Sequence, residues 1–235
     1  MRTAVCTTVK KTNQVFNSIK IIFRPSAMKA FFYYIMEDTI PLLVEKDKIF
    51  EYILTTYGTP GFPSRPQGFE SMSKTILEQQ VSLDSARASF NKLKTLIPEF
   101  TPHTIIEVTD AEFRSCGVSR QKAAYLRALS GAVLEGTIDF SSFPSKDPAQ
   151  VRQELIQVKG IGNWTIDVYL MFSLRSPDIL PLGDIGIISA IKDLLDLTAM
   201  DEILEHTKKW SPYRTTAAFF LWHYYLEKRG RKFPH

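Results

Sequence analysis

Apolar residues recur at helical spacing along most of the chain, and alternating strand patterns are nearly absent. Between residues 69 and 81 the apolar side chains fall three or four positions apart, at Phe69, Met72, Ile76 and Leu77. This spacing predicts an amphipathic helix. Ser82 then offers a cap for a new helix, and Ser119 does the same for a later one. The pattern therefore favours a chain of short helices.

Helical spacing of apolar residues predicts further helices over most of the chain. We expect helices near residues 42–56, 69–81, 82–96, 104–108, 110–115, 120–135, 148–157, 163–173, 184–196, 200–208 and 212–228. Residues 59–66 are rich in Pro and Gly and predict a loop. The expected fold is all-α, with two helical subdomains and the active-site cleft between them.

Composition excludes several classes of protein. The chain has 235 residues but only two cysteines, Cys6 and Cys116. Two thiols are too few for a disulfide framework, a four-cysteine iron–sulfur cluster or a thiolate zinc site. The four histidines show no metal-ligand spacing, and no run approaches the roughly 18 apolar residues of a membrane span. We therefore expect a protein of the reducing cell interior, without an iron–sulfur cluster.

The net charge of +4 is unevenly distributed. Residues 1–36 hold six basic residues and no acidic one, whereas the rest of the chain holds 23 basic and 25 acidic residues. Residues 1–36 are therefore expected to be a separate basic segment, either an organelle transit peptide or a non-native extension upstream of the true start, and residues 37–235 the folded domain. A DNA-binding face must then be local; its candidate cations are Arg87, Lys92, Lys94, Arg120, Lys122, Arg127 and Lys159.

Residues 155–167 contain the most informative motif, with Gly160 and Gly162 between two helical segments. Glycines let the backbone turn tightly and approach another group closely. The amides that open the second helix would attract a phosphate. From the two glycines alone, an ordinary connector between helices is the better interpretation.

About twenty residues after this hairpin, Gly183 and Asp184 precede apolar residues at helical spacing. Taken alone, Asp184 is most simply a helix N-cap, because Asp strongly prefers that position. The order of hairpin, spacer and Gly-Asp favours a second interpretation, in which Asp184 carries chemistry.

That order resembles the helix-hairpin-helix DNA glycosylase superfamily, and further segments resemble its 3-methyladenine DNA glycosylase II branch. The matching segments are Ile76–Ser82, Cys116–Ala123, the hairpin, Asp184 and Trp210–Arg214 continuing to Trp222. Together they span about residues 40–228. The chain departs from the family at Ile166, where alanine is usual.

The resemblance implies a role for each matching residue. It makes Asp184 the catalytic carboxylate and Gln80 the wedge that fills the gap left by an extruded nucleotide. It also implies a base pocket with Trp164, Trp222 and Tyr213, although the helical spacing of residues 218–226 is also compatible with plain core. DNA-binding residues would be Gln80, Lys159, Gly160, Gly162 and Thr165. The backbone carbonyls of Ile156, Val158 and Ile161 would hold a structural Na⁺ or K⁺, and the chemistry itself would need no cofactor.

The implied activity is that of a monofunctional glycosylase, which hydrolyses the N-glycosidic bond of alkylated purines in duplex DNA after base flipping. Bifunctional members of the superfamily place a lysine in the hairpin's second helix, and here that position is Trp164. The expected protein is a monomer that works with DNA inside the cell. The alternatives are a glycosylase for another damaged or mismatched base, a non-catalytic DNA-binding module, or an all-α protein in which the glycines and Asp184 are connector and cap.

Overall fold

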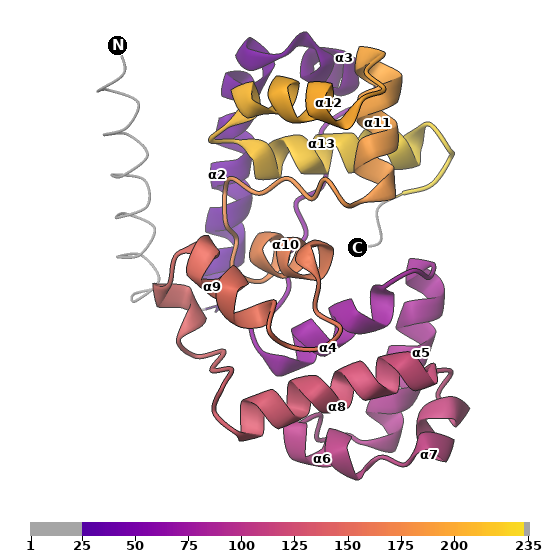
Figure 1. Ribbon diagram of the computed structural model, residues 1–235. Coiled ribbons are helices and arrows are strands. Elements are labelled where there is room, and N and C mark those ends of the chain that lie inside the picture. The colour runs from indigo at the N-terminus through magenta and orange to yellow at the C-terminus, as the bar shows by residue number, and fades with distance from the viewer. Residues whose placement is uncertain (1–24, 233–235) are drawn as a thin grey trace. The chain divides into compact units, whose positions relative to one another are not determined.

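The computed structural model of the protein describes residues 25–232, with side chains described from residue 36 onward. Within this range the regular structure is α-helix and 3-10 helix, and no residue lies in a β-strand (Figure 1). The expected all-α class is confirmed. None of the helices in the described range is long and apolar enough to span a membrane.

The described residues divide into two compact helical units. The first unit contains residues 25–62, 177–180 and 185–232, and the second contains residues 63–176 and 181–184. The helices of the first unit are α2 (Pro25–Lys46), α3 (Lys48–Tyr57), α11 (Ile185–Leu195), α12 (Met200–Thr207), η2 (Lys208–Trp210) and α13 (Arg214–Glu227).

The second unit holds the helices between the loop at residue 63 and the end of α10. They are α4 (Phe69–Glu78), α5 (Leu83–Leu96), α6 (Pro102–Glu107), α7 (Asp110–Ser115), α8 (Arg120–Leu134), η1 (Phe143–Ser145), α9 (Pro148–Leu155) and α10 (Asn163–Phe172). Apart from η1, for which the sequence predicted no helix, these bounds lie within a few residues of the expected ones, because several helix starts are marked by local capping residues. The Ser119 hydroxyl, for example, accepts a hydrogen bond from the Lys122 amide at 3.3 Å, a cap that stabilises a helix by about 1 kcal/mol.

The expected single helix over residues 42–56 is wrong. The chain forms two helices there, since the Asp47 carboxylate accepts a hydrogen bond from the Ile49 amide and caps a new helix, α3. The preceding helix α2 begins at Pro25 and therefore runs through the boundary that we expected at residue 36. Met36 itself is buried. The rest of the expected basic segment, residues 1–24, lies outside the described residues.

An aromatic cluster occupies the core of the first unit. The rings of Phe50, Trp210 and Phe220 are fully buried. Phe50 meets Trp210 edge to face at 5.1 Å between centroids, and meets Phe220 in the same manner at 5.7 Å. Each such pair contributes roughly 0.5–1.5 kcal/mol beyond the burial of its area.

In the second unit, α4 and α8 pack on each other; α5 and α10 contact α4, and α6 and α7 contact α8. Met72 and Ile76 from α4, and Leu126 and Leu129 from α8, are completely buried. Ile166, where the family usually has alanine, is also fully buried in α10. The larger side chain is therefore accommodated in the core beside the hairpin.

Candidate functional site

The hairpin joins α9 to α10 in the second unit, and its first glycine is required for two reasons. Gly160 has φ +88°, a left-handed conformation that side chains other than glycine rarely adopt. A Cβ at this position would also lie 2.1 Å from Cγ of Tyr125. The ring of Tyr125 on α8 therefore packs directly on the hairpin backbone.

The second glycine has a different task. Gly162 is the N-cap of α10 with φ −98°, and a Cβ there would meet no atom within 4 Å. Both Gly162 and the following Asn163 are exposed. The first amides of α10 thus stand at the surface, where helix N–H groups that lack an intrahelical acceptor bind anions. Lys159, just before Gly160, is exposed as well.

An ion pair that the sequence interpretation missed holds the two hairpin helices together. Arg152 on α9 donates to the side chain of Asn163 at 3.0 Å and forms a short salt bridge with Asp167, one turn further along α10. The only local signal for it was a basic residue and an acidic residue on either side of the turn. Their pairing depends on how the hairpin folds back.

The three carbonyls expected to hold a cation belong to the turn of this hairpin. Ile161 donates its amide to the Val158 carbonyl at 3.0 Å, which closes the turn and leaves that oxygen a second lone pair. Val158 and Ile161 have buried side chains, whereas Ile156 is exposed. Neutral backbone carbonyl oxygens are the type of ligand that a monovalent cation such as Na⁺ or K⁺ takes. Among the residues that the structure describes, no group of three His, Cys, Asp or Glu side chains could hold a metal.

The expected wedge residue lies in the turn that follows α4. Gln80 has φ +54°, which is uncommon for a residue with a side chain. Its neighbour Gln79 donates both amide hydrogens to the hairpin region, to the Gly160 carbonyl at 2.9 Å and to the Thr165 hydroxyl at 2.8 Å. Thr165, expected to bind DNA, is only 2% exposed. Its hydroxyl therefore contacts Gln79, and a contact with DNA would be left to its backbone amide.

A cavity of about 600 Å³ lies between this turn, the start of α8 and the hairpin. Its lining consists of Gln79–Val81, Gly117, Ser119, Gln121, Lys122, Tyr125 and residues 156–162. Lys122 donates to the Leu77 carbonyl at the end of α4 at 2.7 Å, and burial lowers the pKa of its ammonium group. Lys122, a candidate DNA-binding cation, is thus also a support for the end of α4.

Other candidate cations also contact the protein itself. Arg127 pairs with Asp110 at 2.6 Å and donates to the Val108 carbonyl at 2.7 Å. Arg87 pairs with Asp84 one turn away in α5. These two arginines therefore have structural partners. Lys159, by contrast, is exposed and lies in the hairpin itself, which makes it the candidate cation best placed to contact a phosphate there.

Asp184 lies in the second unit, directly before the first residue of α11. Its amide donates to the Pro181 carbonyl at 2.9 Å. The indole Nε1 of Trp164 donates to Oδ2 of Asp184 at 2.8 Å. Trp164 is the second residue of α10, so the hairpin's second helix holds the carboxylate directly. The hairpin and Asp184, whose order along the sequence indicated a shared site, are joined in the structure by this bond.

The other two expected pocket residues lie in the first unit, Trp222 within α13 and Tyr213 at the N-cap of that helix. Trp222 is 9% exposed and packs on the ring of Phe219, with 6.0 Å between centroids. Tyr213 lies at the N-terminus of α13 and is partly exposed, and burial raises the pKa of its phenol. Trp222 contacts Phe219, and the Lys46 ammonium lies over the ring of Tyr213, 5.8 Å from its centroid, so both side chains have neighbours within their own unit. Their role in a base pocket stays a prediction.

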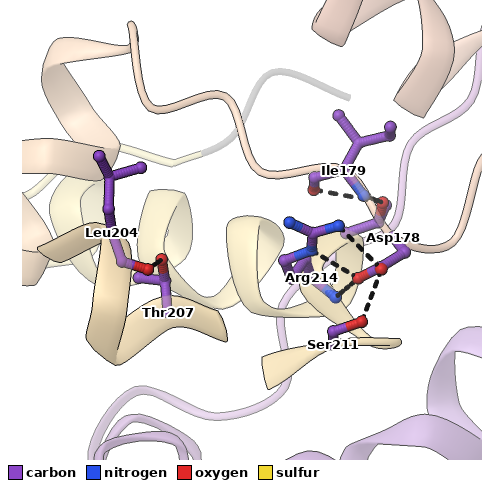
Figure 2. A network of polar contacts seen from close by, with 7 residues as sticks. Asp178, Ile179, Leu204, Thr207, Ser211 and Arg214 are labelled. Carbon is purple, nitrogen blue, oxygen red and sulfur yellow. Dashed lines mark hydrogen bonds and ion pairs between the residues drawn. The ribbon is translucent and has the colours of Figure 1, made fainter. Parts of the chain in front are cut away.

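A polar network anchors the short segment 177–180 to the start of α13 within the first unit (Figure 2). Arg214 donates to both carboxylate oxygens of Asp178, at 2.7 and 2.9 Å, and the Ser211 hydroxyl donates to the same group at 2.8 Å. The Ile179 amide donates to the Thr215 hydroxyl at 3.0 Å. Burial would raise the pKa of Asp178, but the hydrogen bonds from Arg214 and Ser211 outweigh it and lower the pKa.

Comparison with known proteins relates this arrangement to a family. The chain is 34% identical to YfjP of Bacillus subtilis over 165 residues, which are 66% of this chain and 58% of that protein. It is 30% identical to DNA-3-methyladenine glycosylase 1 of Schizosaccharomyces pombe over 170 residues, 67% of this chain and 72% of that one. The chain thus spans less than two thirds of YfjP.

A solved structure agrees with the sequence comparison. The 3-methyladenine DNA glycosylase Mag1 of Schizosaccharomyces pombe, in complex with abasic DNA, superposes with a TM-score of 0.68 at 27% identity, covering 75% of this chain and 90% of that one. The family model described as HhH-GPD superfamily base excision DNA repair protein matches residues 73–212. This stretch includes the turn after α4, the hairpin and Asp184, and the chain belongs to the HhH-GPD superfamily of base excision DNA repair proteins.

Proposed function

We propose that the protein is a monofunctional DNA glycosylase that releases alkylated purines such as 3-methyladenine from duplex DNA, as the first step of base excision repair. The observation that carries the proposal is the hydrogen bond from Trp164 to Asp184. It fixes a carboxylate at the first turn of the helix whose amides suit a DNA phosphate. The relatives named as 3-methyladenine glycosylases support this substrate class.

DNA binding is assigned to the hairpin. The exposed amides at the start of α10 would receive a phosphate oxygen, with Lys159 beside them. The carbonyls of Ile156, Val158 and Ile161 would hold a Na⁺ or K⁺, which when bound adds positive charge next to the phosphate. The protein's own contribution is a backbone turn whose shape depends on Gly160 and Tyr125.

The target base must leave the duplex before its glycosidic bond can be reached. Gln80 is assigned to fill the gap that the flipped nucleotide leaves. Pairing and stacking worth a few kcal/mol are lost when a base is flipped, and a side chain in the gap slows the base's return. Trp222 and Tyr213 are assigned to the pocket, where aromatic faces favour a cationic base by roughly 0.5–2 kcal/mol for each contact.

Bond breakage then needs a negative charge beside the sugar. The C1′–N bond breaks with its electron pair passing to the purine, which leaves neutral because alkylation had made it cationic. Positive charge builds on the deoxyribose, and the ionised carboxylate of Asp184 stabilises it. Water forms the new C1′–O bond and loses a proton to solvent. Trp164 acts by holding one carboxylate oxygen through its N–H, so that the charge is already oriented when the sugar becomes cationic.

The absence of a lysine from this position in α10 supports hydrolysis by water. An amine there could attack C1′ and form a Schiff base, but the residue is Trp164. The product is then an intact strand with an abasic site. The enzyme is assigned as a monomer, and size-exclusion chromatography with light scattering would check this. A role in repair implies that it works where the cellular DNA is.

The direct test is incubation of the purified protein with methylated duplex DNA, followed by chromatography of the released bases. Release of 3-methyladenine or 7-methylguanine is the expected result. A lesion panel distinguishes the nearest alternatives, since an oxidised-purine or mismatch glycosylase would release a different base. Salt-dependent binding without release of any base would instead indicate a non-catalytic DNA-binding module.

A further inference from the structure

We propose that Gln79 is a positioning residue that locks the wedge turn to the hairpin, so that Gln80 and the phosphate-binding amides keep a fixed register. This inference rests on the proposed function, because it concerns how the same site flips a base. The observation behind it is the double hydrogen bond of the Gln79 side chain, which joins residues that are 81 and 86 positions apart in the chain.

The chemistry of the Gln79 side chain makes the link specific. A primary amide has two N–H donors, and Gln79 directs one to the Gly160 carbonyl and the other to the Thr165 hydroxyl. Gly160 is the tightest point of the hairpin, and Thr165 lies in the first turn of α10. One side chain therefore touches both parts of the phosphate-binding hairpin.

The wedge turn is held from a second side. Lys122 donates to the Leu77 carbonyl at 2.7 Å, which fixes the end of α4 just before the turn. The start of α8 is tied in turn to the hairpin, because Tyr125 packs on Gly160. The three segments line the 600 Å³ cavity together. Gln80 also lines it, is exposed and has φ +54°. A residue in this conformation needs its neighbours to hold it there.

This geometry predicts a particular defect when the link is cut. Base flipping requires the wedge to enter the duplex while the hairpin grips the backbone of the same strand region. If the turn moves independently of the hairpin, the hairpin still binds the phosphate, but Gln80 enters the duplex more slowly or in the wrong position. Loss of Gln79 should therefore impair excision of a paired base far more than excision of a base that has no pairing partner.

The test uses Gln79→Leu, which keeps the side-chain volume and removes both donors, and Thr165→Val, which removes one acceptor from the other side. A single 7-methylguanine is placed either opposite cytosine or in a one-nucleotide bulge, with 2-aminopurine next to it as a fluorescent reporter of unstacking. For Gln79→Leu we expect about a tenfold slower release from the paired site, a smaller rise in fluorescence, and at most about a threefold change at the bulge. Thr165→Val should also slow release more at the paired site than at the bulge, but by a smaller factor than Gln79→Leu does.

A double variant separates positioning from general structural damage. If Gln79 acts through Gln80, the Gln79→Leu/Gln80→Ala protein should be no slower on the paired site than Gln80→Ala alone. Equal losses on paired and bulged sites, or additive losses in the double variant, would overturn the proposal. If Gln79→Leu does not fold, as judged by circular dichroism, Thr165→Val with its own double variant decides. A wild-type protein that releases no base would refute the proposed function itself. An active wild type whose Gln79→Leu variant is slowed equally at paired and bulged sites would refute only the positioning role of Gln79.

Discussion

Polar side chains are used in two different ways in the two units. In the first unit, Asp47 is nearly buried and accepts from Trp210 at 2.9 Å, with His206 at 2.7 Å and Lys209 at 3.0 Å. Asp178 is enclosed similarly by Arg214 and Ser211 (Figure 2). These carboxylates are surrounded by donors from their own unit, so their first effect is on stability.

Around the hairpin of the second unit, side chains hold turns in place instead. Gln79 and Lys122 donate to backbone carbonyls, and the indole of Trp164 donates to Asp184. The result is a braced turn whose residues Gly162 and Asn163, at the start of α10, are exposed. Braced turns at the start of an exposed helix therefore indicate a ligand site in this protein, whereas closed polar networks indicate structural support.

The largest effect is expected for Asp184→Asn. The substitution keeps the size of the side chain and most of its capping ability, but it removes the charge that stabilises the sugar cation. Base release should fall by about a hundredfold or more, while DNA binding stays within a few fold. Single-turnover kinetics and a binding titration measure the two quantities. Turnover near the wild-type rate would leave Asp184 as a helix cap only.

The two hairpin glycines form a matched pair for the next prediction. Gly160→Ala places a Cβ against Tyr125 at a left-handed φ, so the turn must change shape. We expect affinity for damaged and undamaged duplexes alike to fall by roughly tenfold. Gly162→Ala meets no neighbouring atom, and its affinity should stay within about twofold of wild type. A specific loss on damaged DNA would contradict the role of the hairpin as a general backbone clamp. Gly162→Asp should lower the affinity for both duplexes, because its carboxylate repels the DNA phosphate while its side chain meets no neighbouring atom.

Trp164→Phe tests the hydrogen bond apart from the aromatic face. Phenylalanine retains a ring but has no N–H for Asp184, so base release should fall by about five- to tenfold. Because the indole acts through the carboxylate, adding Trp164→Phe to Asp184→Asn should cause little further loss. If instead the two losses multiply, Trp164 acts on the base rather than on Asp184.

The smallest effect on catalysis is expected for Asp47→Asn, a change in the closed network of the first unit. Burial would raise the pKa of Asp47, but the hydrogen bonds from Trp210, His206 and Lys209 outweigh it and lower the pKa. A carboxylate with a lowered native pKa contributes stability above its unfolded pKa, near 3.9, and loses that contribution as the pH falls through the native value.

The variant should therefore be less stable than wild type by about 1–3 kcal/mol at pH 7. The difference should shrink below about pH 4. Urea unfolding at several pH values measures the free energy of unfolding. Base release per folded molecule should be unchanged within about twofold. A large catalytic defect in fully folded Asp47→Asn would show that the closed network of the first unit contributes to catalysis as well as to stability.

Much of the fold could be predicted because its signals are local. Helix starts carry their own capping residues, and Ser119 is one example confirmed by its hydrogen bond. The order of hairpin and Asp184 is also a local pattern. By contrast, the contact from Gln79 to Gly160 and the pairing of Arg152 with Asp167 depend on how distant segments fold back. Periodicity does not report such contacts, and the resemblance that assigns Thr165 to DNA does not show that its buried hydroxyl bonds to Gln79.

The central claim is that Asp184 drives hydrolysis by water and leaves the DNA strand intact. One measurement tests it most directly: methylated duplex DNA is incubated with wild type and with Asp184→Asn, and each sample is divided for base chromatography and for denaturing electrophoresis with and without alkali. We predict free alkylpurine from wild type only, with strand breaks appearing only after alkali. Strand scission without alkali at the rate of base release, or a borohydride-trapped adduct on Lys159, would contradict the account.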